Sequence, residues 1–600
     1  MLRKHRGVDP PSHLACQMVT RSYTMKLWVP LLLTAWMATL SKAQQQEATT
    51  STEPPMEVRL RQGVITGAQS EAGNGRVFYS FKTIPFAEPP VGDLRFRDPV
   101  PAGPWTGVRN GSIATPKCPQ LGNTTVEGKE DCLYLSVYTP RPYASDLPVM
   151  VWIHGGGFTN GHGEYYGPLP LLTKDVVLVV IQYRLATLGF LSTEDSELPG
   201  NLGLKDQTMA LLWVQDNIRD LGGDPAKVTL FGESAGAAAV HFHVLSPMSS
   251  GLFRRAILQS GTSLCPWASA ENHRQVAAKI GQMFNCSGLD DQQSTSSSAF
   301  VACLRNAPYE DLISAQKEFV IFNAAPQVML PRVDGQFLPD YPANLLRKGW
   351  YNKVDMISGV TQDEGAVIGL IFTLNKTAAN SLVQNFTVNG PVSLLFEAWE
   401  DDPEYLARRA YHHYLGAIEV TEEKRDSLIR LSSDRLFDMC HLDAVGQHLR
   451  TSHQNVFTYR LQHDGEHQFV FGLFPTVPDW FKSYVGHADD ILYLFSGAEG
   501  NKTLKQDEDL FVSRIMVELW TNFATFGNPT PDMSLGFKWN PTSFPTDSYL
   551  SITSSPTMKT FEDCEIREFW KNMPTKNNKM LYPERFYNCR LPGCIDMYLQ

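Results

Sequence analysis

The chain has 600 residues, of which 43% are hydrophobic and 19% charged, a composition typical of a globular protein that can build one large core. A formal net charge of −11 argues against a nucleic-acid partner. The chain has no internal repeat, no zinc-type cysteine spacing and no phosphate-binding glycine loop, so we expect no metal ion and no cofactor.

The N-terminal region predicts the cellular compartment. Residues 25–43 have a basic start, an apolar middle and small residues at the end, the pattern of a secretory signal with cleavage near Ala43. Residues 1–24 are either a long extension of that signal or lie before a true start at Met25. Polar residues 44–56 predict a flexible linker. The last residues, 595–600, are neither an endoplasmic-reticulum retention signal nor an anchor tail, so we expect an extracellular protein without a membrane anchor.

The first chemical motif follows a predicted buried strand at 148–154. That strand ends in His154-Gly-Gly-Gly, a loop that lipases and esterases use to bind an oxyanion. Glycines suit this purpose because backbone N–H groups must approach a substrate without intervening side chains. We predict that Gly156 and Gly157, together with the N–H of Ala235, form an oxyanion hole.

A second motif places a serine on a sharp turn. Residues 228–236 read VTLFGESAG, a strand that leads directly into Gly-x-Ser-x-Gly, and helix-forming residues follow up to 245. In such an elbow the serine hydroxyl is exposed above the edge of a sheet. A turn serine in a glycine-rich loop is the alternative, but the flanking strand and helix favour Ser234 as a nucleophile.

An acid and a base are expected after this serine in the order Ser, Asp/Glu, His. A strand at 354–359 breaks into an acidic loop that contains Asp363 and Glu364, and a strand at 455–461 precedes a loop with His487. Among 15 histidines, His487 stands out because it follows a glycine in the loop after the last strand. We predict a catalytic triad of Ser234, Glu364 and His487.

The strand pattern predicts the fold class. Buried-type strands at 148–154, 176–183, 227–231, 255–260, 354–359 and 455–461 alternate with helical stretches such as 209–221. This alternation predicts an α/β fold, with a mostly parallel central sheet and helices on both faces.

Several longer motifs together resemble the type-B carboxylesterase/cholinesterase family over nearly all of residues 57–570. They are IPFAEPPVGDLRF at 84–96, EDCLYL at 130–135, FGESAG at 231–236 and LQSG at 258–261. The resemblance implies an α/β-hydrolase domain over residues 57–575 with a tail at 576–600, and it selects Glu364 rather than Asp363 as the acid. The segment GHADD at 486–490 is more similar to the corresponding segment of arthropod carboxylesterases, including the juvenile-hormone-esterase type, and of bile-salt-type lipases than to that of cholinesterases.

The same resemblance implies a disulfide pattern. It pairs Cys118 with Cys132, Cys286 with Cys303 and Cys440 with Cys564, and it leaves Cys265 as a buried free thiol. Cys589 and Cys594 fall outside the matching block and either pair locally or link subunits. Sequons that suit a secreted glycoprotein occur at Asn110, Asn123, Asn285, Asn375, Asn385 and Asn501.

The residues expected to bind the substrate differ from those of cholinesterases. The 118–132 loop contains no aromatic residue, so the tryptophan that holds choline is missing and acetylcholine is disfavoured. At the acyl side, cholinesterases carry phenylalanines where Ala325 and Gln327 stand here, which predicts a roomier pocket. We expect Phe158 and Trp267 to line this pocket and Glu233 to tune His487.

The sequence therefore predicts a secreted hydrolase that acts on small, lipophilic, uncharged esters through an acyl-enzyme. Glu233 departs from the glutamine common in dedicated juvenile-hormone esterases, which counts against that narrow role. Two alternatives are a non-catalytic adhesion module like the neuroligins and a stoichiometric scavenger of esters or organophosphates. The complete triad argues against adhesion. The oligomeric state is left open.

Overall fold

A computed structural model of the chain describes residues 56–587, except 145, 290–296, 324, 397–399, 473, 475, 498–502 and 544–546. The predicted signal region and the linker up to residue 55 lie outside these residues, as do Asn501, Cys589 and Cys594.

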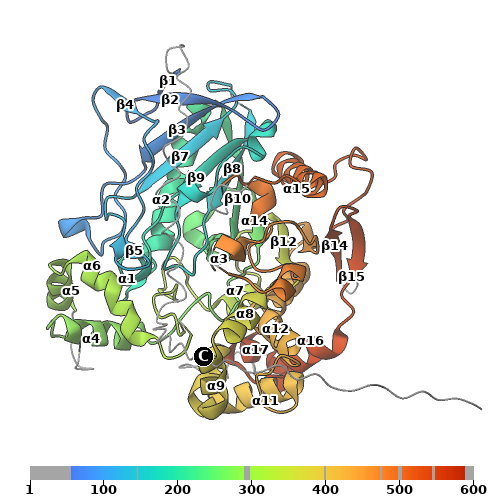
Figure 1. Ribbon diagram of the computed structural model, residues 1–600. Coiled ribbons are helices and arrows are strands. Elements are labelled where there is room, and N and C mark those ends of the chain that lie inside the picture. Colours follow the sequence, from blue (N-terminus) through green and yellow to red (C-terminus); the bar gives the residue numbers. More distant parts are fainter. Residues whose placement is uncertain are drawn as a thin grey trace, which may run out of the picture.

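The core of the fold is a 13-stranded sheet in the order β1-β2-β3-β7-β9-β8-β10-β11-β12-β13-β14-β15, with β4 paired to β2 (Figure 1). All six predicted strands are confirmed, and they lie side by side and parallel in its centre. In sheet order they are β9 (Val177–Ile181), β8 (Leu147–Ile153), β10 (Gly223–Glu233), β11 (Arg255–Gln259), β12 (Asp355–Thr361) and β13 (Val456–Leu461). Their apolar, β-branched runs suit burial on both faces.

Further strands flank this parallel centre on both sides. On one side β1 (Met56–Arg59), β2 (Val64–Glu71), β3 (Val77–Pro85) and β7 (Tyr134–Thr139) form an antiparallel edge, which β4 (Val108–Asn110) joins. On the other side lie β14 (Ser548–Ile552) and β15 (Thr557–Thr560). A separate hairpin of β5 (Gln120–Leu121) and β6 (Val126–Glu127) lies inside the first disulfide loop.

Helices fill the connections between strands. They are α1 (Ala186–Phe190), α2 (Leu202–Asn217), α3 (Ala235–Leu245), α4 (His273–Met283), α5 (Ser298–Arg305), α6 (Tyr309–Ser314), α7 (Pro342–Lys348), α8 (Ala366–Leu374), α9 (Lys376–Gln384), α10 (Phe386–Ser393), α11 (Pro403–Leu415), α12 (Arg425–Ser433), α13 (Met439–Thr451), α14 (Ile491–Leu494), α15 (Asp507–Phe526), α16 (Cys564–Lys571), α17 (Lys576–Leu581) and α18 (Pro583–Phe586). A π-helical turn, η8 (Asp434–Asp438), joins α12 to α13.

The sheet is buried on both faces, as predicted. Along β8, Val149 and Val151 point into a core shared with α2 and α3, whereas Met150 and Trp152 point into a second core shared with α15. Residues 235–245 are buried along the whole length of α3, which follows the nucleophile strand directly. Helices therefore cover both faces of the sheet and hold the ends of the strands in place.

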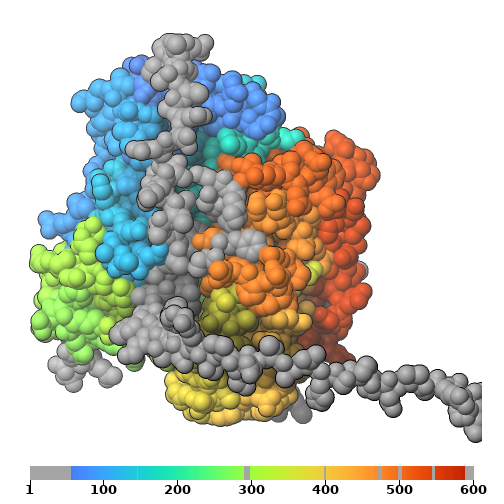
Figure 2. Space-filling view, viewed as in Figure 1, coloured from blue at the N-terminus to red at the C-terminus, as the bar shows by residue number. Residues whose placement is uncertain are grey.

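The C-terminal boundary differs from the prediction. Residues 576–586 are not a tail, because α17 and α18 are helical and Met580 and Leu581 are buried in the main core. At the other end, Met56 already belongs to β1 rather than to a linker. Figure 2 shows the blue N-terminal residues at the top of the molecule and the orange and red C-terminal residues along one side.

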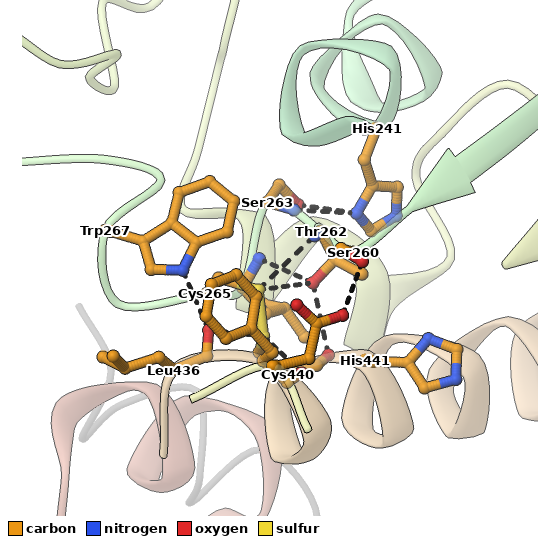
Figure 3. Close-up of a disulfide and its surroundings, with 12 residues drawn as sticks. His241, Ser260, Thr262, Ser263, Cys265, Trp267, Leu436, Cys440 and His441 are labelled. Atoms are coloured by element: carbon orange, nitrogen blue, oxygen red, sulfur yellow. Dashed lines mark hydrogen bonds between the residues drawn. A yellow bond between two sulfur atoms is a disulfide. The ribbon is translucent and has the colours of Figure 1, made fainter. Parts of the chain in front are cut away.

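One predicted disulfide is wrong. The Cys118–Cys132 and Cys286–Cys303 bonds are present, but Cys440 is bonded to Cys265 rather than to Cys564. The reason is local: the hydroxyl of Thr262 donates to the carbonyl of Cys440 at 3.2 Å and brings the turn after β11 onto α13 (Figure 3). Cys564 is an exposed free thiol at the start of α16.

Within the described ranges, no single helix is long and apolar enough to cross a bilayer. Helices α8 and α9 pass such a test only as a pair, with a bend of 99° between them.

Candidate active site

Ser234 lies on a strained turn between β10 and α3. Its φ of 57° and ψ of −124° are rare for a residue with a side chain, and backbone strain of this kind is common at functional sites. The flanking glycines are required by space: a Cβ on Gly236 would lie 2.0 Å from the carbonyl oxygen of Ile153, and one on Gly232 would lie 2.6 Å from the same atom. The elbow predicted from the motif is therefore present.

His487 and Glu364 are brought together from loops that are far apart in the sequence. Nδ1 of His487 lies 2.6 Å from Oε2 of Glu364, whose side chain is completely buried. The histidine is partly exposed in the same cavity as Ser234. The ring of Phe437 packs against the imidazole with centroids 4.6 Å apart. This geometry leaves Nε2 as the nitrogen available for proton transfer.

Glu364 is held by two further donors. The hydroxyl of Ser260, at the end of β11, donates to Oε1 of Glu364 at 2.5 Å, and the N–H of Thr361 donates to the same atom at 2.8 Å. Asp363 points elsewhere, because its Oδ2 accepts the N–H of Val485 at 3.1 Å. The sequence analysis missed Ser260, although it follows the LQ of the LQSG motif.

Glu233 flanks the other side of the imidazole. Its Oε1 lies 3.0 Å from Nε2 of His487, without the alignment of a hydrogen bond. Burial raises the pKa of Glu233 to about 8. Burial alone lowers the pKa of His487, but Glu233 and Glu364 outweigh it and raise that pKa to about 9. Glu364 and the ionised form of Glu233 therefore both stabilise the imidazolium form.

The glycine loop after β8 borders the same cavity. Gly156 has a φ of 105° and Gly157 a φ of 61°, both in the left-handed region. A Cβ on Gly156 would lie 2.2 Å from the carbonyl oxygen of Asn160, so no other residue fits there. Both glycines line the cavity, and Ala235 supplies the first N–H of α3 directly after Ser234.

A cavity of about 430 Å³ extends from these groups. Its lining combines Ser234, His487 and the glycine loop with mostly apolar side chains from the loop after β11 and from α8, α10 and η8. Aromatic members that the sequence analysis did not identify are Tyr166, Phe322, Phe372, Tyr411, Phe437 and Phe469. Trp267, Glu233, Ala325 and Gln327 also line the cavity.

Phe158 does not line this cavity, which corrects the prediction. Its φ of 60° turns the side chain into the core, where it is completely buried and packs on Phe190 with ring centroids 5.2 Å apart. Phe158 therefore packs in the core beneath the glycine loop, on the side away from the cavity.

Two walls of the cavity are joined. The indole N–H of Trp267 donates to the carbonyl of Leu436 at 2.9 Å, and the Cys265–Cys440 bond lies beside this contact (Figure 3). Trp267 comes from the loop after β11, and Leu436 from η8. A covalent and a hydrogen-bonded link thus hold segments about 170 residues apart at a fixed spacing.

Two largely buried arginine–carboxylate pairs outside the site are held by forked hydrogen bonds. Arg184 forms a two-bond fork with Asp206 at 2.6 and 2.8 Å, and Arg95 does the same with Glu130 at 2.5 and 2.6 Å. Over the described residues, no group of three or more His, Cys, Asp or Glu side chains is arranged to hold a metal ion.

Comparison with known proteins gives a consistent result. Residues 54–570 match the carboxylesterase family. The chain is 38% identical to a juvenile hormone esterase of Tribolium castaneum over 81% of this chain and 86% of that protein. It is 33% identical to venom carboxylesterase-6 of Apis mellifera, over 86% and 94% of the two chains. It is also 33% identical to an acylcarnitine hydrolase of Mus musculus, over 83% and 87%.

Proposed function

The chain belongs to the carboxylesterase family, with its α/β-hydrolase fold, and on that premise we propose that it hydrolyses lipophilic, uncharged esters through an acyl-enzyme on Ser234. The observation that carries the proposal is the meeting of three groups at one cavity: a strained serine, a His487–Glu364 pair and a glycine loop. Members of this family are carboxylic ester hydrolases. The proposal therefore concerns which residues catalyse the hydrolysis and which esters are the substrates.

In the proposed acylation step, Ser234 Oγ attacks the ester carbonyl while Nε2 of His487 takes the hydroxyl proton. The carbonyl oxygen becomes an oxyanion, which the N–H groups of Gly156, Gly157 and Ala235 stabilise. The bond to the alcohol then breaks, and His487 gives its proton to the leaving alkoxide. Glu364 stabilises the imidazolium throughout, which its 2.6 Å contact supports.

Deacylation repeats the sequence with water as the nucleophile. His487 removes a proton from water, the hydroxide adds to the acyl carbon, and the Ser234–acyl bond breaks with return of the proton to the serine. Glu233 lies 3.0 Å from Nε2 and is suited to orient this water. The products are a carboxylic acid and a free serine.

The cavity supports the substrate class. Its volume of about 430 Å³ and mostly apolar lining suit a ligand with one or two extended hydrocarbon groups. Ala325 and Gln327 leave room at the acyl side. Relatives are named for juvenile hormone and for acylcarnitine, so chemically different esters are processed on this fold. A terpenoid methyl ester and a xenobiotic ester both belong to the proposed class.

We further propose secretion and N-glycosylation. Three disulfides support an oxidising compartment. Among the sequons in the described residues, Asn110, Asn285 and Asn385 are exposed, whereas Asn123 and Asn375 are half-buried. Exposure of a sequon permits attachment of a glycan at that site.

Steady-state turnover on p-nitrophenyl esters of increasing acyl length tests the proposal. The expected result is many turnovers per active site, with kcat/KM rising from acetyl to a longer acyl chain because more apolar surface is buried. A single burst of one p-nitrophenol per enzyme without turnover would instead identify a stoichiometric scavenger. No burst and no turnover would contradict both.

A further inference from the structure

A glutamine that the proposed mechanism does not use lies directly against the oxyanion loop, which we define as residues 155–161. Gln120 is completely buried, and its side chain bonds to Gly161 twice. Its Nε2 donates to the carbonyl of Gly161 at 2.8 Å, and its Oε1 accepts the N–H of Gly161 at 3.0 Å. The amide therefore pairs with Gly161 as a neighbouring β-strand would.

Gly161 is in turn packed against the start of the oxyanion loop. A Cβ on Gly161 would lie 2.5 Å from the carbonyl oxygen of Gly155 and 2.2 Å from Nδ1 of His154. The carbonyl of Gly156 accepts the N–H of Asn160 at 2.9 Å, which closes the loop on itself. No side chain separates Gly161 from Gly155, and the hydrogen bond from Asn160 ties the end of the loop to Gly156. Because the loop is packed this closely, we expect a shift of Gly161 to displace Gly155 and Gly156.

Gln120 is itself held in place by the first disulfide loop. Its Nε2 also donates to the carbonyl of Cys118 at 3.0 Å, and Cys118 is bonded to Cys132. The residue belongs to β5, which pairs with β6 in the register Gln120 to Glu127. A buried amide costs free energy unless its groups are bonded, and here both ends are bonded to backbone. A side chain held this firmly can transmit its position to Gly161.

We propose that Gln120 is a positioning residue for the oxyanion hole: it fixes the glycine loop so that the N–H groups of Gly156 and Gly157 point at the developing oxyanion. The inference rests on the proposed function, which assigns those two N–H groups to the oxyanion. Hydrogen bonds to an oxyanion strengthen in the transition state, so loss of alignment lowers kcat more than it raises KM.

The test compares Gln120→Met with Gln215→Met. Methionine has a similar volume and cannot pair with Gly161. Gln215, on α2, is a matched control because its Nε2 also bonds two backbone carbonyls, those of Pro225 and Leu252, both at 2.9 Å and outside the cavity. The readouts are kcat and KM for p-nitrophenyl butyrate, the melting temperature, and the inhibition constant of a trifluoromethyl ketone, which forms an oxyanion when the serine adds to it.

For Gln120→Met we expect a loss of about 10- to 100-fold in kcat, a small change in KM and a matching weakening of the ketone. Gln215→Met should lower the melting temperature and leave kcat and the ketone unaffected. If Gln120→Met does not fold, Gln120→Glu decides the point, because it keeps an acceptor for the Gly161 N–H and removes the donor.

A folded Gln120 variant whose kcat and ketone affinity stay within about twofold of wild type would overturn the inference. The proposed function would be unaffected by that result, because it depends on turnover by the wild-type enzyme. Equal losses in the Gln120 and Gln215 variants would also overturn it, because both would then act only through stability. Absence of turnover by the wild-type enzyme would instead contradict the proposed function itself.

Discussion

The carboxyl group of Glu233 lies 3.0 Å from Nε2 of His487, and that of Glu364 lies 2.6 Å from the other ring nitrogen, Nδ1. Glu233 directly precedes the proposed nucleophile, Ser234, in the chain, so its carboxyl group acts on the base at the nitrogen where the proton must arrive. The base of the proposed mechanism is therefore flanked by two carboxyl groups, and its proton affinity is the first property to test.

The pH dependence of kcat/KM should reflect this arrangement. His487 must be neutral to accept a proton, and its pKa is raised to about 9, so activity of the free enzyme should increase with pH toward that value. Glu233→Gln removes one raising charge and should move the acid limb of the profile to lower pH. Profiles from about pH 5 to 10 on a neutral ester measure the shift. Asp363→Asn is the control and should leave the limb in place; a Glu233→Gln profile that coincides with wild type would contradict the argument.

Ser234 should be the residue that an organophosphate labels. Ser234→Ala should lower kcat on the order of 10⁶-fold, because the remaining groups can only orient water. Peptide mapping of the labelled protein identifies the site, and Ser260, whose hydroxyl donates to Glu364, should stay unlabelled. Label on a different peptide, or an active alanine variant, would remove Ser234 from the mechanism.

Glu364→Gln should reduce kcat on the order of 10⁴-fold, because a neutral amide does not stabilise the imidazolium and favours the wrong tautomer. Asp363→Asn should cost less than about tenfold, since the side chain of Asp363 bonds the N–H of Val485 and not the imidazole. Steady-state kinetics of the two variants on one ester gives the comparison. The reverse ranking would show that the neighbouring carboxylate is the acid.

A neutral ester should be a better substrate than the choline ester of the same acid. The 118–132 loop contributes Gln120 and Leu121 to the cavity and no aromatic face, and a missing cation–π contact gives up about 0.5–2 kcal/mol. The ratio of kcat/KM for a neutral isosteric butyrate ester and butyrylcholine measures this effect with the acyl group held constant. A preference for butyrylcholine would mean that another lining ring, such as Trp267 or Phe437, binds the cation.

The disulfide pattern can be checked directly. Digestion without reduction should yield a peptide pair that joins Cys265 to Cys440, and iodoacetamide should modify Cys564 in the folded protein. Cys564→Ser should therefore leave the free energy of unfolding nearly unchanged, whereas Cys440→Ser should lower it by about 2–4 kcal/mol. A peptide that joins Cys440 to Cys564 would restore the pairing expected from the family resemblance.

The parallel centre of the sheet was predictable because each of its strands contains a mostly apolar stretch that is bounded by loops. The flanking strands were not identified, since β15, for example, is short and mostly exposed and its pattern resembles a loop. Within the site, motif order predicted Ser234, Glu364 and His487 as a group, and the structure places Glu364 and His487 in contact.

The errors have physical causes that a linear sequence does not display. Phe158 follows the glycine loop, but its left-handed backbone turns the ring away from the cavity. Ser260 bonds Glu364, 104 residues away in the chain, and Gln120 bonds Gly161, 41 residues away. No sequence motif predicts either hydrogen bond. Cys265 pairs with Cys440 because a turn and a helix meet in three dimensions, which a resemblance based on the position of each cysteine does not predict.

The proposed reacting groups follow the carboxyl ends of β8, β10, β12 and β13 in the parallel centre of the sheet. Much of the cavity wall comes instead from α8, α10 and η8 in the long connection between β12 and β13. Substitutions in that connection can reshape the space offered to an ester while every strand keeps its partners. Apart from Phe437, which packs on the imidazole of His487, we therefore expect substitutions of cavity-lining residues in this connection to alter which ester is bound more than how it is cleaved.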